Sequence, residues 1–357
     1  MFCLTQGMKS IAVLGGLFIG TCQAASLTVL VGGGMLGDSM MTSVVEPFEK
    51  ATGIKVNAVK QQCAPAIIRT MAQSKRQDID LCMLSSASMI VLAREGLLGE
   101  INYQAIDPAV AEQIEPALRH KYGVGFFNYA IALGYDRSKL RGAVNPPQSW
   151  GEFWDPKKFP GSRILQSGAY PGQGPWEEAL IADGVPVEKL YPIDVDRALK
   201  SLDKIKPAVR KWWMVGAEQE QAFSGGGAAM GQGFDGVFQN VMKTNEKVAY
   251  TYAQAKIYTL HLVVPKGAKN SLEAEKFINF ALNAERQALF SKLSGYSPTN
   301  RSAFKFLDPA FASTLVGAPG NKEKAYYSNA DWYSALDASG KTNAEALINR
   351  WNEWVLK

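Results

Sequence analysis

Histidine is scarce in this sequence, with His120 and His261 as its only two copies among 357 residues. A histidine-based zinc site or a Ser-His-Asp triad must bring histidine together with further ligands or with a nucleophile. His261 falls in a β-rich run, residues 256–265, where a structural role is expected. The composition therefore predicts no metal site, no cofactor and no catalytic residue, and we expect a protein that is not an enzyme.

An excess of either charge is also missing. The chain has 38 basic and 33 acidic residues, a formal net charge of +5, and the two signs are interspersed. Nucleic-acid binding calls for a clustered basic patch, so no nucleic-acid partner is predicted. With 47% hydrophobic and 20% charged residues the composition is that of a globular protein, and the length allows two domains.

A long apolar run occurs only at the N-terminus. Met8-Lys9 precedes the uncharged residues 11–20, and Cys22-Gln23-Ala24-Ala25 follows. A basic start, a core of about ten apolar residues and small residues before the cleavage point are typical of a secretory signal. We predict a signal peptide over residues 1–24 and a periplasmic mature protein. The threonine before Cys22 disfavours acylation at that cysteine.

Residues 207–265 alternate between strand-like and helix-like patterns. An apolar run at 208–215 contains Trp212-Trp213, and a second run at 228–231 leads to Phe234-Asp235-Gly236. Helical compositions follow each run, and the β-rich residues 256–265 close the stretch. In open α/β sheets ligands bind at the carboxyl ends of strands, which places the loops 212–216 and 234–236 at a binding site.

The N-terminal part repeats this pattern with a glycine-rich turn. Strand-like residues 27–31 lead into Gly32-x-Gly34-x-x-Gly37 and a helix bent or restarted at Pro47. The spacing matches a dinucleotide fingerprint, so an exported NADP-dependent oxidoreductase with Lys60 near the 2′-phosphate is one alternative. No acid ends the next strand, residues 54–59, which favours a tight turn that brings backbone close to a ligand.

Several motifs resemble one family in the same order along the chain. They include Phe153-Trp154-Asp155, Phe159-Pro160-Gly161, Lys211-Trp212-Trp213-Met214-Val215-Gly216, Phe234-Asp235-Gly236 and Leu262-Val263-Val264-Pro265. The chain resembles family 1 extracellular solute-binding proteins of ABC transporters, in the spermidine/putrescine (polyamine) and 4-aminobutyrate-like branch. The resemblance implies a two-domain α/β periplasmic binding protein of type II, closing at a hinge, with a mixed sheet and flanking helices in each domain.

The same resemblance implies a domain division and partners. The N-terminal lobe would comprise residues 25–134 plus 262–304, and the C-terminal lobe residues 135–261 plus 305–357. The protein would be a monomer that captures a small solute and delivers it to an inner-membrane ABC permease, or a ligand sensor coupled to a receptor. The strand order 2-1-3 of the family separates the strands near Cys63 and Cys82, so we expect no disulfide between them.

The expected ligand is a small amine-containing solute, either a polyamine such as putrescine or spermidine or a 4-aminobutyrate-like amino acid. By the same resemblance, Leu260 replaces a family carboxylate on the strand of residues 256–265, which argues against a long polyamine. A ligand with one ammonium group, and with Arg210 or Lys211 near its carboxylate, fits about as well. Asp235 would hold the ammonium, or alternatively cap a helix. The predicted ligand contacts are Gly33, Gly34, Ser85, Ser86, Trp176, Glu177, Trp212, Trp213, Phe234, Asp235, Tyr258 and Tyr296.

The last helix is predicted from a capping box, Thr342 with Glu345, and should bury Leu347, Trp351, Trp354 and Val355 on one face.

Overall fold

A computed structural model describes residues 26–140 and 145–357. The predicted signal peptide over residues 1–24, with Cys22, lies outside the described residues. Within the described ranges, every helix is too short or too polar to cross a membrane.

The chain begins with a small parallel sheet. Strands β1 (Ser26–Leu30) and β2 (Lys55–Val59) pair in parallel, and the residues leading into β3 (Cys82–Ser85) lie along the other side of β1. The Thr28 carbonyl accepts from the Leu81 amide at 3.2 Å, and the Leu30 amide donates to the Leu81 carbonyl at 3.0 Å. The predicted order 2-1-3 is therefore confirmed.

Helices connect these strands. Helix α1 (Gly34–Met40) continues through a π-helical turn (Met41–Val45) into α2 (Glu46–Thr52), and α3 (Pro65–Ser74) leads to β3. Pro47 has no amide hydrogen to donate to the preceding turn, which explains why the regular α pattern is interrupted just before it. The predicted bend or restart at Pro47 is thus present.

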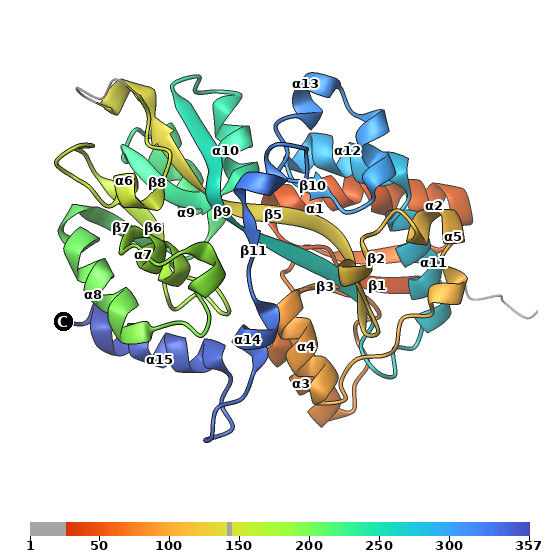
Figure 1. Ribbon diagram of the computed structural model, residues 1–357. Helices are drawn as coiled ribbons and strands as arrows, with labels where there is room; N and C mark the ends of the chain where they lie inside the picture. The colour runs from red at the N-terminus through yellow and green to blue at the C-terminus, as the bar shows by residue number, and fades with distance from the viewer. Residues whose placement is uncertain (1–25, 141–144) are drawn as a thin grey trace, which may run out of the picture.

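Two long antiparallel strands run through the molecule. Strand β5 (Gly123–Asp136) and strand β9 (Val248–Val263) pair from Val124↔Leu262 to Asp136↔Val248. At one end β9 also pairs with β3, and at the other β5 pairs with β8 (Met230–Phe234). Figure 1 shows both strands passing between the two halves of the molecule. The predicted strand 256–265 is thus the later part of β9, which begins eight residues earlier, at Val248.

The second half follows the predicted alternation. Strand β7 (Val209–Trp213), α9 (Gly216–Ser224), β8 and α10 (Asp235–Met242) succeed one another, and β9 closes the series. Strand β6 (Arg163–Gln166) lies between β7 and β8 and is parallel to both. The carboxyl ends of these three strands therefore meet at one edge of the sheet.

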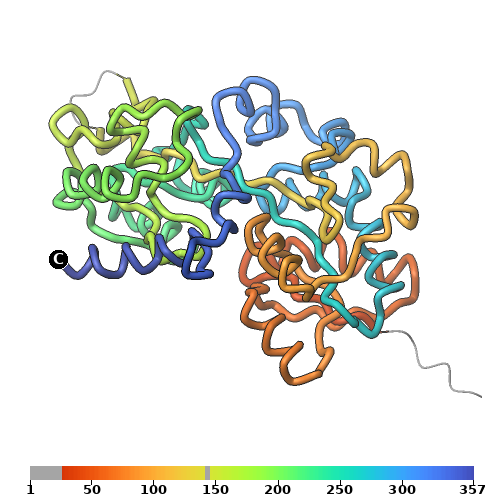
Figure 2. The backbone as a smooth tube through the Cα atoms, turned by 60° about the horizontal axis from the view of Figure 1, so that its bottom comes forward, coloured from red at the N-terminus to blue at the C-terminus, as the bar shows by residue number. Residues whose placement is uncertain are grey.

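The last helix, α15 (Asn343–Val355), packs on the second half beside α8 (Val195–Ile205), as Figure 2 shows at its blue end. The Thr342–Glu345 capping box is present, and Leu347, Trp351 and Trp354 are buried as predicted, whereas Val355 is half-buried.

The remaining helices are α4 (Ser86–Arg94), α5 (Pro108–Ala111), α6 (Trp150–Phe153), α7 (Trp176–Ala182), α11 (Ser271–Ala281), α12 (Ala284–Ser294), α13 (Pro309–Ala312) and α14 (Ala330–Ser334). The remaining strands are the short β4 (Arg119–His120), β10 (Ser297–Pro298) and β11 (Tyr326–Tyr327), of which β11 lies along β9.

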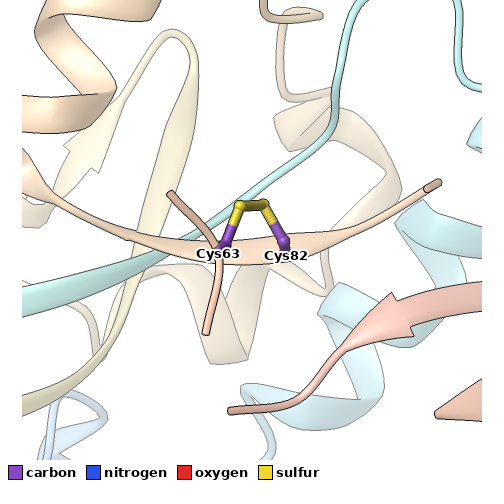
Figure 3. The surroundings of a disulfide bond; sticks show 2 residues. All are labelled: Cys63 and Cys82. Carbon is purple, nitrogen blue, oxygen red and sulfur yellow. A yellow bond between two sulfur atoms is a disulfide. The ribbon is translucent and has the colours of Figure 1, made fainter. Parts of the chain in front are cut away.

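Contrary to expectation, Cys63 and Cys82 form a disulfide bond, with their Cα atoms 6.0 Å apart (Figure 3). The strand order was predicted correctly, but Cys63 does not lie on β2. It lies in the connection to α3, which crosses the end of β1, where the Gly32 amide donates to the Gln61 carbonyl at 3.2 Å. The crossing brings Cys63 into the cluster of buried side chains that contains Cys82.

Replacing both cysteines by alanine should lower the free energy of unfolding by about 3 kcal/mol, because the bond closes a loop of 19 residues in the unfolded chain. Urea denaturation of the double variant against the oxidised parent measures this difference. Thiol titration of the unfolded, unreduced mature protein should find no free thiol, and two free thiols would contradict the bond.

Candidate functional site

A cavity of about 490 Å³ lies beside the middle of β9. Segments far apart in sequence form its walls, among them the start of α4, residues 115–120, residues 257–261 of β9, and residues 326–331 from β11 into α14. Strands β3 and β11 both pair with β9 on the side away from β5, at Ser85↔Leu260 and Tyr326↔Lys256. The cavity therefore opens where neither short strand covers the edge of β9.

The side chains in the cavity wall are aromatic, acidic and hydroxylic. Five tyrosines line it: Tyr191, Tyr258, Tyr326, Tyr327 and Tyr333. Glu115 and Asp331 contribute carboxylates, of which Glu115 is paired with Lys322 just outside the lining, and the lining residues that the structure describes include no lysine or arginine. Tyrosine rings and carboxylates attract cations, so this wall suits a ligand that carries positive charge.

Two of the tyrosine hydroxyls have no partner. The hydroxyl oxygens of Tyr258 and Tyr326 are buried and make no hydrogen bond to any described residue. Burial raises the pKa of both phenols well above the usual value, so they stay neutral and able to donate. Buried polar groups are nearly always hydrogen-bonded. These two hydroxyls, like both ring nitrogens of His261 in the same wall, therefore have hydrogen-bonding capacity that no described residue uses.

The start of α4 supplies a different kind of contact. Ser85 is the N-cap residue, and its Oγ accepts from the Ser88 amide at 3.3 Å. Ser85 thus caps the helix, and Ser85, Ser86 and Ala87 also line the cavity. Free amide groups at a helix N-terminus favour an anion, so this wall suits a carboxylate.

A buried ion cluster lies behind the tyrosines. The Lys256 ammonium is 2.6 Å from Glu177 and 3.2 Å from Glu178, and all three side chains are inaccessible to solvent. Burial would lower the pKa of Lys256, but the two carboxylates outweigh it and raise that pKa. Burial raises the pKa of Glu178 despite the nearby ammonium.

Glu177 was predicted to touch the ligand, and the structure shows its carboxylate bonded within the protein. Its Oε2 binds Lys256, and its Oε1 accepts from the hydroxyls of Tyr191 at 2.6 Å and Tyr333 at 2.8 Å. The two tyrosines line the cavity, so Glu177 lies one layer behind its wall. The first turn of α7 faces β9 rather than the open space.

Four predicted aromatic contacts gather around a tyrosine that was not predicted, Tyr129 on β5. Its ring centre is 5.6 Å from Phe234, 5.4 Å from Tyr258 and 6.0 Å from Tyr296, and Trp213 packs on Phe234 at 5.0 Å. Tyr258 is the member of this group that also lines the cavity. The others support its ring from behind, because they fill the space between β5, β8 and the β10 region.

Trp212 and Trp176, also predicted as ligand contacts, do not line this cavity. Adjacent residues of a strand point to opposite faces, so Trp213 reaches Phe234 while Trp212 packs edge-on against Trp351 of α15 at 5.0 Å. Trp176 also packs on Trp351, at 5.9 Å. Both side chains belong to the hydrophobic core that α15 covers.

The glycine turn and the predicted basic residues are also away from the cavity. Gly33 is the N-cap residue of α1 and Gly34 its first residue, and neither lines the cavity. Lys60 is paired with Asp38 at 2.6 Å. The proposed carboxylate partners Arg210 and Lys211 are exposed, the latter paired with Glu218 at 2.7 Å.

Asp235 is turned inward and hydrogen-bonded within the protein. Its Oδ1 accepts from the amides of Ala130 at 3.0 Å and Gly236 at 2.9 Å, and its Oδ2 accepts from the Tyr252 hydroxyl at 3.1 Å. The β5–β8 ladder ends at Ile131↔Phe234, so the carboxylate takes the place of the next strand partner. The N-cap residue of α10 is Phe234, so Asp235 does not have the alternative capping role. In place of the predicted ammonium contact, its carboxylate oxygens accept hydrogen bonds from within the protein.

The structure brings in tyrosines that the sequence analysis missed. Tyr191, Tyr326, Tyr327 and Tyr333 come from segments without a recognisable motif, and only their contacts with β9 and α7 place them together. Among the described residues no group of three or more His, Cys, Asp or Glu side chains is arranged to hold a metal ion.

Burial raises the pKa of Asp235 to about 7. A raised folded-state pKa favours the fold at low pH, and this contribution is lost as pH rises from about 4 to 7. The unfolding free energy of the parent should therefore fall relative to that of Asp235→Asn across this range, by up to about 4 kcal/mol. Urea denaturation at several pH values tests this. The parent should show no such decline relative to the control Asp196→Asn, which retains Asp235, because the Arg350 pairing lowers the pKa of Asp196.

Comparison with known proteins identifies the family. The profile described as bacterial extracellular solute-binding protein matches residues 43–315. A gamma-aminobutyric acid-binding protein of Pseudomonas aeruginosa is 30% identical over 94% of this chain and 92% of its own length. A spermidine/putrescine-binding periplasmic protein of Escherichia coli is 23% identical over 85% of this chain and 86% of its own.

The fold agrees with these matches. An ABC transporter substrate-binding protein of Bradyrhizobium japonicum has a solved structure that is 32% identical, with a TM-score of 0.83 over 92% of this chain and 99% of that chain. These relatives are named as binding proteins rather than as enzymes, and the resemblance inferred from the sequence motifs is confirmed. The chain belongs to the bacterial extracellular solute-binding protein family.

Proposed function

We propose that this protein captures a small amine-containing solute in the periplasm and delivers it to an inner-membrane ABC permease. The observation that carries the ligand class is the wall of the 490 Å³ cavity, with five tyrosines, two acids and no lining lysine or arginine among the described residues. The proposal includes export through the N-terminal signal peptide and action as a monomer.

A solute with one ammonium and one carboxylate fits the cavity better than a polyamine. The ammonium would lie against the Tyr258 and Tyr326 rings and hydroxyls, and the carboxylate at the N-terminus of α4. The P. aeruginosa relative named for gamma-aminobutyric acid is the more similar of the two curated relatives, at 30% against 23% identity. We therefore favour a 4-aminobutyrate-like amino acid over putrescine or spermidine.

The two-lobe organisation is part of the proposal. We assign residues 25–134 and 262 onward to the first lobe, and residues 135–261 with the C-terminal segment to the second. Leu307 and Leu315 pack with Ala288 of α12, which supports extending the first lobe through Leu315 instead of ending it at residue 304. The segment that follows contains β11. It would be a third connection between the two lobes, beside β5 and β9.

Both lobes contribute to the cavity, which supports capture by hinge closure. Ser85 and Ser86 come from the first lobe, while Tyr191 and Tyr333 come from the second. A ligand that touches both lobes binds the closed state more tightly and shifts the population toward it.

We further propose that the bound solute is not turned over. The NADP alternative relied on Lys60 as a free cation near the glycine turn, and Lys60 is paired with Asp38. A receptor-coupled sensor would use the same cavity and the same closure, so it differs in its membrane partner alone.

Removing the unpartnered hydroxyls should weaken binding without unfolding the protein. Tyr258→Phe and Tyr326→Phe should each reduce affinity for 4-aminobutyrate about fivefold, because a neutral hydrogen bond contributes roughly 1 kcal/mol. Titration calorimetry measures the affinity and thermal denaturation the stability, which should be unchanged.

The matched control is Tyr252→Phe, which removes a hydroxyl bonded to Asp235 and to the Thr314 carbonyl. It should lower stability and leave affinity unchanged. Equal affinity in the parent and both cavity variants would show that these hydroxyls do not meet the ligand.

Closure predicts a smaller radius of gyration when the ligand is bound. Small-angle X-ray scattering should show this decrease with saturating 4-aminobutyrate but not with sodium butyrate, which lacks the ammonium group. An unchanged radius at a concentration that calorimetry shows to be saturating would rule out hinge closure.

A further inference from the structure

The buried ion cluster behind the cavity has the form of an ammonium-binding site that is already filled. The Lys256 ammonium has three donors, and they reach Glu177 at 2.6 Å, Gly174 carbonyl at 3.0 Å and Glu178 at 3.2 Å. Two carboxylates and one carbonyl are the partners that a primary ammonium of a solute would also require.

This site adjoins the cavity directly. Lys256 and Tyr258 are two residues apart on β9 and so point to the same face, and the Lys256 ammonium lies 5.7 Å from the centre of the Tyr258 ring. Tyr191 and Tyr333 line the cavity and donate to Glu177 from the other side. A single layer of phenol rings thus separates the cavity from the carboxylates.

One carboxylate oxygen of the cluster accepts no hydrogen bond from Lys256 or from any other described residue. Glu178 Oε1 is buried and has no hydrogen-bond partner among the described residues. A purely structural ion pair would be expected to satisfy its buried oxygens, because burying charge is costly and well-packed apolar residues often stabilise a fold as well. The unfilled oxygen points to a site whose chemistry is the binding of ammonium groups.

We infer that Lys256 determines specificity by occupying this second ammonium site, so that the protein accepts a solute with one ammonium and rejects diamines. The inference deepens the proposed function, since it rests on an amine as the solute of the adjoining cavity. In a diamine the first ammonium would meet the tyrosine wall, while the second would find both carboxylates already bound by Lys256.

Lys256→Ala tests the inference, because the fragment that it removes has the shape of n-propylammonium. The variant should gain thermal stability with n-propylammonium chloride and not with n-propanol, which has nearly the same shape without the charge. Its affinity for putrescine should rise about tenfold or more over the parent, while that for 4-aminobutyrate should not rise.

The matched control combines Lys256→Ala with Glu177→Gln and Glu178→Gln, and it should lose the response to n-propylammonium. Equal responses to n-propylammonium and n-propanol, or a response that persists in this control, would overturn the inference. If Lys256→Ala folds only with an additive, refolding yield with n-propylammonium against n-propanol gives the same comparison.

The parent protein supplies a measurement that does not depend on any variant. Putrescine and n-butylammonium differ by one ammonium group. If Lys256 fills the second site, putrescine should bind no more tightly than n-butylammonium. A preference of about tenfold for putrescine would show that a second site is open and would overturn the inference. If the parent binds no amine, the proposed ligand class fails, while the n-propylammonium response of Lys256→Ala still decides the role of Lys256.

Discussion

The antiparallel pairing of β5 with β9 is the interaction on which the rest of the structure depends. All fourteen residues of β5 are buried, and its ladder with β9 runs over nearly the whole length of both strands, from Val124↔Leu262 to Asp136↔Val248. The small parallel sheet of β1 and β2 adjoins this ladder through β3, and strands β6 and β7 join it through β8. Any ligand site between the two halves must be built against these two strands, because they are the continuous element that both halves share.

Two side chains on the same face of β9 have different roles. Lys256 and Tyr258 point to one face, where the lysine anchors α7 through Glu177 and the tyrosine lines the cavity while stacking on Tyr129. The Tyr258 ring is therefore held by a rigid ladder and by an aromatic cluster, so little side-chain freedom would be lost if it met a ligand. The buried charges lie directly behind it, where solvent does not screen them.

The departures from expectation share a cause, which is that local pattern cannot show which way a side chain turns. Adjacent tryptophans in β7 were both assigned to the ligand, but strand alternation sends Trp212 to α15 and Trp213 to Phe234. Asp235 follows a strand and opens a helix, yet its carboxylate completes the edge of β5. Cys63 was separated from Cys82 by strand order, and the crossing of the connection over β1 brought them together.

The strand order 2-1-3 was implied by the resemblance to the family, whereas the sequence by itself determined the element order, the interruption at Pro47, the capped final helix and the family. These features follow from hydrophobic periodicity, from proline and capping chemistry and from motifs within short windows, all of which act locally. Only the tertiary structure decided the composition of the cavity wall and the pairing of Lys256 with Glu177 and Glu178. Tyr191, Tyr258, Tyr326 and Tyr333 meet because β11 and α14 return to β9 after long intervals of chain, and burial and pairing at such distances depend on how the whole chain packs.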